Sequence, residues 1–164
     1  MTSKARVHWQ PMVTTISHSP ADTQSLGEAW GRSASCGRVF CLSGDLGAGK
    51  TQLVKGLARG LGITQCVHSP SFSLVNIYTG GRLVLFHLDL YRLDRREQFV
   101  KAGLEDYLQP EGVTVIEWAE RWFPDPSGER TKFAGRNLPK SFCWVQIVAL
   151  NETERRITYE DPGA

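Results

Sequence analysis

A segment of eight residues in the first third of the chain has the residue types and the spacing that bind phosphate groups. It matches the P-loop (Walker A) pattern G-x-x-x-x-G-K-[ST] at every fixed position. In this pattern the glycines let the backbone turn so that its N–H groups face an anion at the start of a helix. The lysine reaches the β- and γ-phosphates, and the threonine hydroxyl binds Mg²⁺. The segment therefore predicts a nucleotide-binding loop, made of Gly44, Asp45, Leu46, Gly47, Ala48, Gly49, Lys50 and Thr51.

The residues on either side of this loop are expected to form a strand and a helix. Residues 38–43, with the sequence Arg-Val-Phe-Cys-Leu-Ser, are an apolar run of strand length. From residue 50 to residue 61 the apolar side chains recur at helical spacing, and Gly62 follows as a stop signal. The pattern requires this order of strand, loop and helix, which favours it over a plain glycine-rich turn.

A phosphate-binding loop also needs a carboxylate on the metal side, at the end of a neighbouring strand. Two acids are candidates, because Asp89 follows the apolar run 84–88 and Glu117 follows the apolar run 113–116. Ligands of open α/β sheets bind outside the carboxyl ends of the strands, so either acid could face the phosphates. Each could instead cap a helix or pair with a nearby arginine. The residues alone leave both open as metal ligands.

Three serines, Ser69, Ser71 and Ser73, lie around Pro70 and form a third candidate group. Hydroxyls on a segment stiffened by proline could contact the γ-phosphate and rearrange on hydrolysis, as switch loops do. The alternative is a plain turn, which is the more common role of Ser-Pro segments.

Two further side chains lie beside the candidate acids. Trp118 follows Glu117 and either lines the pocket or fills the core. His87 lies two residues before Asp89 and so shares its face of the strand, where we expect a hydrogen-bonded core histidine.

The rest of the chain predicts the elements that position these residues. The sequence Ser19-Pro20-Ala21-Asp22 is typical of a helix start, with a capping serine, a proline at the first position and an early acid. Residues 72–78 and 82–91 flank a Gly-Gly turn and predict a hairpin. Further expected elements are a helical stretch over 94–108 broken at Gly103, a strand over 113–118, and strands over 142–150 and 156–159 joined by a polar turn.

These elements predict an α/β fold, with a three-layer P-loop NTPase-like sheet that is mixed and has antiparallel edge strands. A length of 164 residues is expected to form a single domain, 1–164. Within it we expect a flexible tail over residues 1–12 and a loop over residues 124–140, which are rich in Pro, Gly and charge.

Composition excludes several classes of protein. Hydrophobic residues make up 41% of the chain and charged residues 22%, as in globular proteins with a sizeable core. The net charge of +2 does not by itself call for a nucleic-acid partner. No stretch has the length of a membrane span and no signal peptide is apparent, so we expect a cytoplasmic protein. The four cysteines show no metal-binding spacing and are expected to be buried, reduced thiols.

Several motifs together resemble one known family. Besides the loop, these are Ser69–Asn76 (SPSFSLVN), His87–Leu93 (HLDLYRL), Gly103–Tyr107 (GLEDY) and the pair Glu117-Trp118. In this order and spacing they resemble the TsaE (YjeE) family, small bacterial ATPases of the pathway that makes threonylcarbamoyladenosine (t6A) in tRNA. The resemblance runs from about Ser19 to Glu120, and the D-L-Y-R-L and E-W elements are more specific than the P-loop.

The resemblance implies a role for each candidate residue. Lys50 and the loop amides would hold the phosphates of ATP, while Thr51 and Glu117 would lie at Mg²⁺. Asp89 would take the catalytic or metal-side acid role, and Trp118 would lie beside the nucleotide. The segment of Ser69, Ser71 and Ser73 would act as a switch.

The resemblance also implies a reaction and partners. ATP would be hydrolysed to ADP and phosphate, and the partners would be the TsaD and TsaB proteins, with tRNA reached through that complex. The start of the helix over residues 19–23 would approach the adenine.

Two other functions remain open from the residues. A small-molecule kinase would need an arginine-rich lid, for which Arg92, Arg95 and Arg96 are the candidates. A non-enzymatic module would use ATP only to control assembly. We expect Arg92, three residues after Asp89, to point away from the carboxyl edge of the sheet. The chain would then lack an arginine finger of its own and hydrolyse ATP slowly without a partner.

Overall fold

The computed structural model describes residues 12–123 and 142–160, and these residues form a single seven-stranded sheet. The sheet strands are β1 (Met12–Ser17), β2 (Val39–Ser43), β3 (Val75–Tyr78), β4 (Leu85–Asp89), β5 (Val113–Glu117), β6 (Phe142–Ala149) and β7 (Arg155–Glu160). Their order across the sheet is β1-β7-β6-β2-β5-β4-β3. The loop predicted over residues 124–140 lies outside the described residues, as do residues 1–11. Met12, predicted as the end of the tail, instead begins β1 because it pairs with Glu160 of β7.

The sheet is mixed, as predicted. Strands β6, β2, β5 and β4 run parallel, while β3 pairs antiparallel with β4 and β7 pairs antiparallel with β6 and β1. Antiparallel strands therefore form both edges. The predicted hairpin is formed by β3 and β4, and a short turn joins β6 to β7. Because the four central strands are parallel, their carboxyl ends meet at one edge of the sheet.

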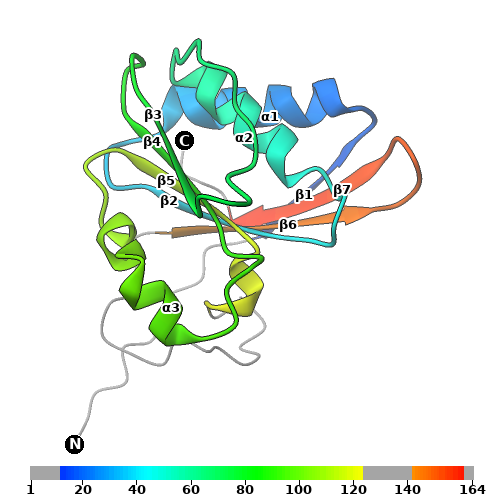
Figure 1. Ribbon diagram of the computed structural model, residues 1–164. Coiled ribbons are helices and arrows are strands. Elements are labelled where there is room, and N and C mark those ends of the chain that lie inside the picture. Colours follow the sequence, from blue (N-terminus) through cyan, green and yellow to red (C-terminus); the bar gives the residue numbers. More distant parts are fainter. Residues whose placement is uncertain (1–11, 124–141, 161–164) are drawn as a thin grey trace, which may run out of the picture.

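Helices cover both faces of the sheet and complete three layers (Figure 1). Helices α1 (Pro20–Ser33) and α2 (Lys50–Gly60) lie on one face, over an apolar cluster that includes Phe40 and Leu57. The other face is covered by α3 (Arg96–Lys101) with the 3₁₀ turns η1 (Leu104–Leu108) and η2 (Ala119–Arg121). They close a second cluster that includes Phe99 and Trp122.

Helix α1 begins where the sequence predicts. Ser19 is its N-cap, and the Ser19 hydroxyl accepts a hydrogen bond from the N–H of Asp22 at 3.1 Å. Pro20 occupies the first helical position, where its missing N–H would have had no partner.

Four glycines bring the backbones of α1 and α2 into direct contact. Gly27 and Gly31 of α1 face α2, and Gly56 and Gly60 of α2 face α1. A Cβ atom on any of the four would lie 2.1–2.3 Å from a backbone carbonyl oxygen of the other helix. No larger residue fits at these positions without moving a helix. The contact therefore fixes α2, and the loop that precedes it, against α1.

The prediction of buried cysteines is right for two of the four. Cys41 and Cys143 are buried in the sheet, but Cys36 and Cys66 are exposed because they lie in loops after α1 and α2. All four are free thiols. Within residues 12–123 and 142–160, no helix is long and apolar enough to span a membrane.

Candidate active site

The predicted phosphate-binding loop joins β2 to α2 at the carboxyl edge of the sheet. Gly49 is the N-cap of α2 and has φ = 103°, a left-handed conformation that glycine adopts without steric cost. No group in the described part of the chain accepts a hydrogen bond from the N–H groups of Gly49, Lys50 or Thr51. The first N–H groups of a helix carry a partial positive charge, so this end of α2 is suited to an anion.

The side chain of Lys50 folds back onto the phosphate-binding loop. Its side-chain Nζ donates to the carbonyl oxygens of Gly44 at 2.6 Å and Asp45 at 3.0 Å, and lies 4.0 Å from the centre of the Trp118 ring. The residue is only 5% exposed. Burial lowers the pKa of the ammonium group from its usual value, although nearby acids, Glu117 foremost, oppose that shift.

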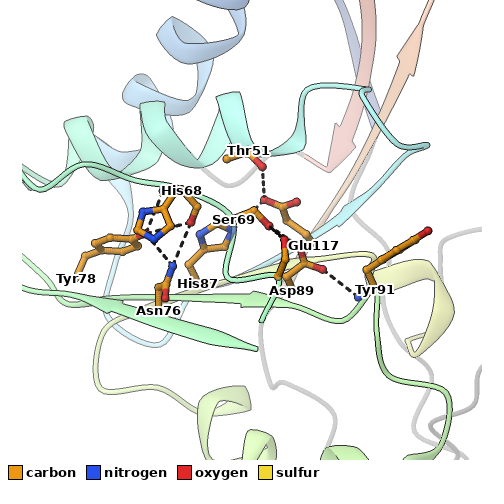
Figure 2. A network of polar contacts seen from close by, with 10 residues as sticks. Thr51, His68, Ser69, Asn76, Tyr78, His87, Asp89, Tyr91 and Glu117 are labelled. Carbon is orange, nitrogen blue, oxygen red and sulfur yellow. Dashed lines mark hydrogen bonds and ion pairs between the residues drawn. The ribbon is translucent and has the colours of Figure 1, made fainter. Parts of the chain in front are cut away.

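Thr51 and Glu117 are in direct contact, as Figure 2 shows. The Thr51 hydroxyl donates to Glu117 Oε1 at 2.9 Å. His87, fully buried, forms a hydrogen bond through Nε2 to the same oxygen at 2.9 Å. The expectation of a hydrogen-bonded core histidine at position 87 is confirmed. Its partner is the candidate metal-side acid, so His87 fixes the orientation of the Glu117 carboxylate.

Asp89 lies beside Glu117 because the two end neighbouring parallel strands in register. One Asp89 oxygen accepts a hydrogen bond from the Ser69 hydroxyl at 2.6 Å, and the other accepts from the N–H of Tyr91 at 2.9 Å (Figure 2). The Ser71 hydroxyl lies 3.2 Å from that of Ser69. The carboxylate of Asp89 is thus buried and held from two sides.

The segment before Ser69 is tied to the β3–β4 hairpin. The backbone of His68 exchanges hydrogen bonds of 3.2 Å with the Tyr78 hydroxyl, and its carbonyl also accepts from Asn76 at 3.1 Å (Figure 2). Ser73, by contrast, donates to the side chain of Asn76 at 3.2 Å and does not line the cavity. The structure therefore brings Ser69 and Ser71 to Asp89 but leaves Ser73 at the hairpin.

Trp118 adopts an unusual backbone conformation. It has φ = 62°, and among the described residues only Leu74 is another non-glycine with positive φ. A bulky side chain in this region is strained, and such strain is concentrated at functional sites. The conformation places the Trp118 ring against Tyr91, with centroids 4.8 Å apart, and beneath the Lys50 ammonium.

These groups open into one cavity of about 560 Å³. The loop, both acids and Trp118 line one side of it. Pro20 and Thr23 of α1 also line it, as do Glu152 and Thr153 of the β6–β7 turn and Arg155 at the start of β7. Sequence reasoning did not single out Arg155, because nothing local links position 155 to a loop more than a hundred residues earlier.

The expectation that Arg92 points away from the carboxyl edge is wrong. Arg92 lines the cavity, and its guanidinium lies 4.2 Å from the centre of the Phe72 ring. The chain turns after β4, at Tyr91 and Arg92, so that the strand's alternation no longer decides where the Arg92 side chain lies.

Glu120 is a second residue that sequence reasoning missed. Its Oε1 accepts a hydrogen bond from the N–H of Gly44 at 3.4 Å, at the start of the loop. Burial raises the pKa of the Glu120 carboxyl, although its backbone hydrogen bonds and Lys50 oppose the shift. Glu120 could be found from the sequence, because it is an acid two residues after the Glu117-Trp118 pair.

The oxygen donors at this edge suit Mg²⁺. The Thr51 hydroxyl and the carboxylates of Glu117 and Asp89 lie together in the cavity, and hard cations prefer oxygen ligands. Mg²⁺ is usually held by one or two carboxylates together with the phosphates of a substrate, and this cavity offers both carboxylates and an anion-binding helix start.

Comparison with known proteins identifies the family. A family model described as "Threonylcarbamoyl adenosine biosynthesis protein TsaE" matches residues 17–157. This chain belongs to the TsaE family. The TsaE match covers the loop, both acids, the serine segment and the β6–β7 turn, and extends past the part of the chain on which the resemblance rested.

Individual TsaE proteins are similar over most of their length. The tRNA threonylcarbamoyladenosine biosynthesis protein TsaE of Treponema pallidum (strain Nichols) is 47% identical over 143 residues, 87% of this chain and 96% of that protein. The protein of the same name from Bacillus subtilis (strain 168) is 34% identical over 145 residues, 88% of this chain and 83% of that protein. The crystal structure of Bacillus subtilis YdiB superposes with a TM-score of 0.71 at 32% identity, covering 95% of this chain and 89% of the other.

Proposed function

We propose that this chain is an ATPase that serves the threonylcarbamoyl modification of adenosine in tRNA. Its relatives carry the name of that pathway. The observation that carries the proposal of ATP hydrolysis is the contact between Thr51 and Glu117 beside Asp89, in the cavity of the phosphate-binding loop. The whole chain would act as one ATPase domain in the cytoplasm, where tRNA is modified.

Binding of ATP would use the loop and the residues around it. Lys50 would exchange its hydrogen bonds to the Gly44 and Asp45 carbonyls for bonds to the β- and γ-phosphates, which are stronger acceptors. The unpartnered N–H groups from Gly49 to Thr51 would donate hydrogen bonds to phosphate oxygens. Thr51 and Glu117 would hold Mg²⁺, with Asp89 near it. The bound metal would neutralise charge that develops on the phosphates.

Hydrolysis would depend on Asp89. Its two hydrogen bonds, from the Ser69 hydroxyl and the Tyr91 N–H, hold the carboxylate in one orientation, which lets it position a water molecule. Ser69 belongs to the candidate switch segment, so the arrangement of Asp89 would depend on that segment. A loss of the γ-phosphate could then alter Ser69, Ser71 and the exposed residues that follow them.

Two exposed apolar side chains near the cavity favour binding of a protein partner. Leu46 in the loop is 81% exposed and Phe72, after Ser71, is 85% exposed. Exposed apolar patches beside a site are typical of interaction surfaces. Leu46 lines the cavity, and Phe72 packs against Arg92, which lines it too. We propose the TsaD and TsaB proteins as partners, with tRNA reached through their complex.

The isolated chain should therefore hydrolyse ATP slowly, and TsaD with TsaB should accelerate it at least about tenfold, since completing a P-loop site in trans gains much larger factors. Phosphate release is measured for the purified chain, then with the partners, then with tRNA. An Arg92→Ala variant is run in parallel, because Arg92 is an arginine of this chain that lines the cavity.

Three outcomes would contradict the proposal. Fast turnover by the chain alone, lost in Arg92→Ala and unchanged by the partners, would show a self-sufficient enzyme. Transfer of phosphate to a small acceptor would show a kinase. Tight ATP binding without any phosphate release, with or without partners, would show a non-enzymatic module.

Glu117→Gln should shift the Mg²⁺ dependence of ATP hydrolysis. The amide removes the charge but keeps the shape and a hydrogen-bond acceptor for Thr51. The Mg²⁺ concentration for half-maximal turnover should rise by about tenfold or more, since even indirect metal contacts contribute 10–100-fold to affinity. Glu111→Gln, on an exposed loop residue, is the matched control. An unchanged Mg²⁺ dependence would remove Glu117 from the metal site.

A further inference from the structure

Arg155 reaches the phosphate-binding loop from β7, which only β6 separates from β2, the strand that leads into the loop. It is the first residue of β7, where it pairs with Ser17 of β1 and Ala149 of β6. Its Nε donates to the carbonyl oxygen of Ala48 at 3.0 Å, and its Nη2 donates to that of Gly47 at 3.4 Å. The side chain thus holds two consecutive peptide carbonyls of the loop.

The remaining terminal nitrogen of Arg155 holds the β6–β7 turn. Nη1 donates to the carbonyl oxygens of Asn151 at 2.7 Å and Glu154 at 3.0 Å, and is 3.4 Å from that of Glu152. The Asn151 side chain fixes the turn further, because it accepts from the N–H of Glu154 at 2.8 Å. Within the described residues, one guanidinium therefore contacts five carbonyl oxygens of two loops.

This contact sets the direction of a loop amide. In a trans peptide the C=O and the N–H point in opposite directions. The hydrogen bond from Arg155 to the Ala48 carbonyl therefore turns the N–H of Gly49 away from Arg155. Gly49 is the N-cap of α2, and its N–H belongs to the unpartnered group described above.

Such a contact matters because this loop is rich in glycine. Gly47 and Gly49 have φ values of 77° and 103°, and glycine loses more conformational freedom on ordering than any other residue. Without Arg155, phosphate binding would have to order these residues itself, which reduces affinity. A guanidinium suits the task because its planar, rigid set of donors can hold several carbonyls at once.

We propose that Arg155 is a positioning residue that preorganises Gly47, Ala48 and Gly49 for phosphate binding, without touching the phosphates itself. The inference rests on the proposed nucleotide site. It gives the β6–β7 turn a part in nucleotide binding.

The test compares Arg155→Gln, Arg155→Lys and the control Arg156→Gln, which makes the same change at the next, exposed residue of β7. Calorimetry at 20 °C gives the Kd for ADP with Mg²⁺, and melting without nucleotide gives the Tm. Arg155→Gln should raise the Kd about tenfold. Arg155→Lys keeps the charge but not the planar set of donors, so its Kd should lie between that of the unaltered chain and that of Arg155→Gln. In ¹⁵N relaxation spectra without nucleotide, the amides of Gly47 and Gly49 should become more mobile in Arg155→Gln.

The outcomes separate the two proposals. If the unaltered chain and Arg156→Gln do not bind ADP, the proposed nucleotide site itself is wrong. If both bind but Arg155→Gln binds equally well, or lowers only the Tm, then Arg155 has a structural role alone. The same conclusion follows if the Gly47 and Gly49 amides are unaffected. Should Arg155→Gln fail to fold, an Arg155→Lys Kd equal to that of the unaltered chain overturns the proposal.

Discussion

Lys50→Ala should weaken ATP binding by about 10- to 100-fold and reduce hydrolysis to background. A hydrogen bond to a charged group contributes about 1.5–3 kcal/mol, and each 1.4 kcal/mol is a factor of ten in affinity. The fold should be unaffected. Since burial lowers the pKa of Lys50, the charged ammonium is held at a free-energy cost, and its removal should leave the Tm unchanged or slightly raised.

The measurement is ATP affinity by calorimetry with the Tm alongside. Lys55→Ala, on the exposed side of the same helix, is the matched control and should bind ATP normally. Affinity and turnover like those of the unaltered chain in Lys50→Ala would remove the proposed phosphate site. A large fall in Tm would show that the lysine serves the fold instead.

Asp89→Asn should separate hydrolysis from binding. The amide fits the same space and can still accept the Ser69 or the Tyr91 hydrogen bond, so ATP affinity should stay within about threefold. Turnover at saturating ATP should fall about 100-fold or more, because a positioned acid or base contributes 10²–10⁴-fold to rate. Single-turnover phosphate release, measured beside ATP binding, checks both.

Asp106→Asn, at an exposed position on η1, controls for the loss of a negative charge. If Asp89→Asn loses ATP affinity in a Mg²⁺-dependent way but turns over normally once saturated, Asp89 is a metal ligand and not the hydrolytic acid. A nucleotide-bound structure with Asp89 distant from Mg²⁺ and its waters would exclude both roles.

The parts of the site that lie on one strand or one loop could be predicted from sequence. The loop over residues 44–51 is a contiguous pattern whose backbone requirements are visible in its glycines. Asp89 and Glu117 each follow a run of strand residues, and parallel strands bring such positions to the same edge. The mixed sheet is predictable from two short turns, at residues 79–81 and 151–153, because short turns join antiparallel strands.

The missed parts depend on contacts between distant segments. Arg155 begins β7, and only the sheet order, in which β6 alone separates β7 from β2, places that strand near the loop. The position of Arg92 does not follow from the alternation of β4, because that strand ends at Asp89 and the chain turns at Tyr91 and Arg92. The contact of Ser69 with Asp89 depends on how the hairpin holds His68, which no local spacing reveals.

The glycine contact between α1 and α2 makes these two helices a single mechanical element. Side chains between helices normally absorb small displacements by changing rotamer, but here the two backbones touch directly. A shift at the start of α2 when a ligand binds would therefore carry α1 with it, and with α1 the edge strand β1 that leads into it. The two helices would likewise unfold and refold together as one cooperative unit, because neither can leave without exposing the backbone of the other.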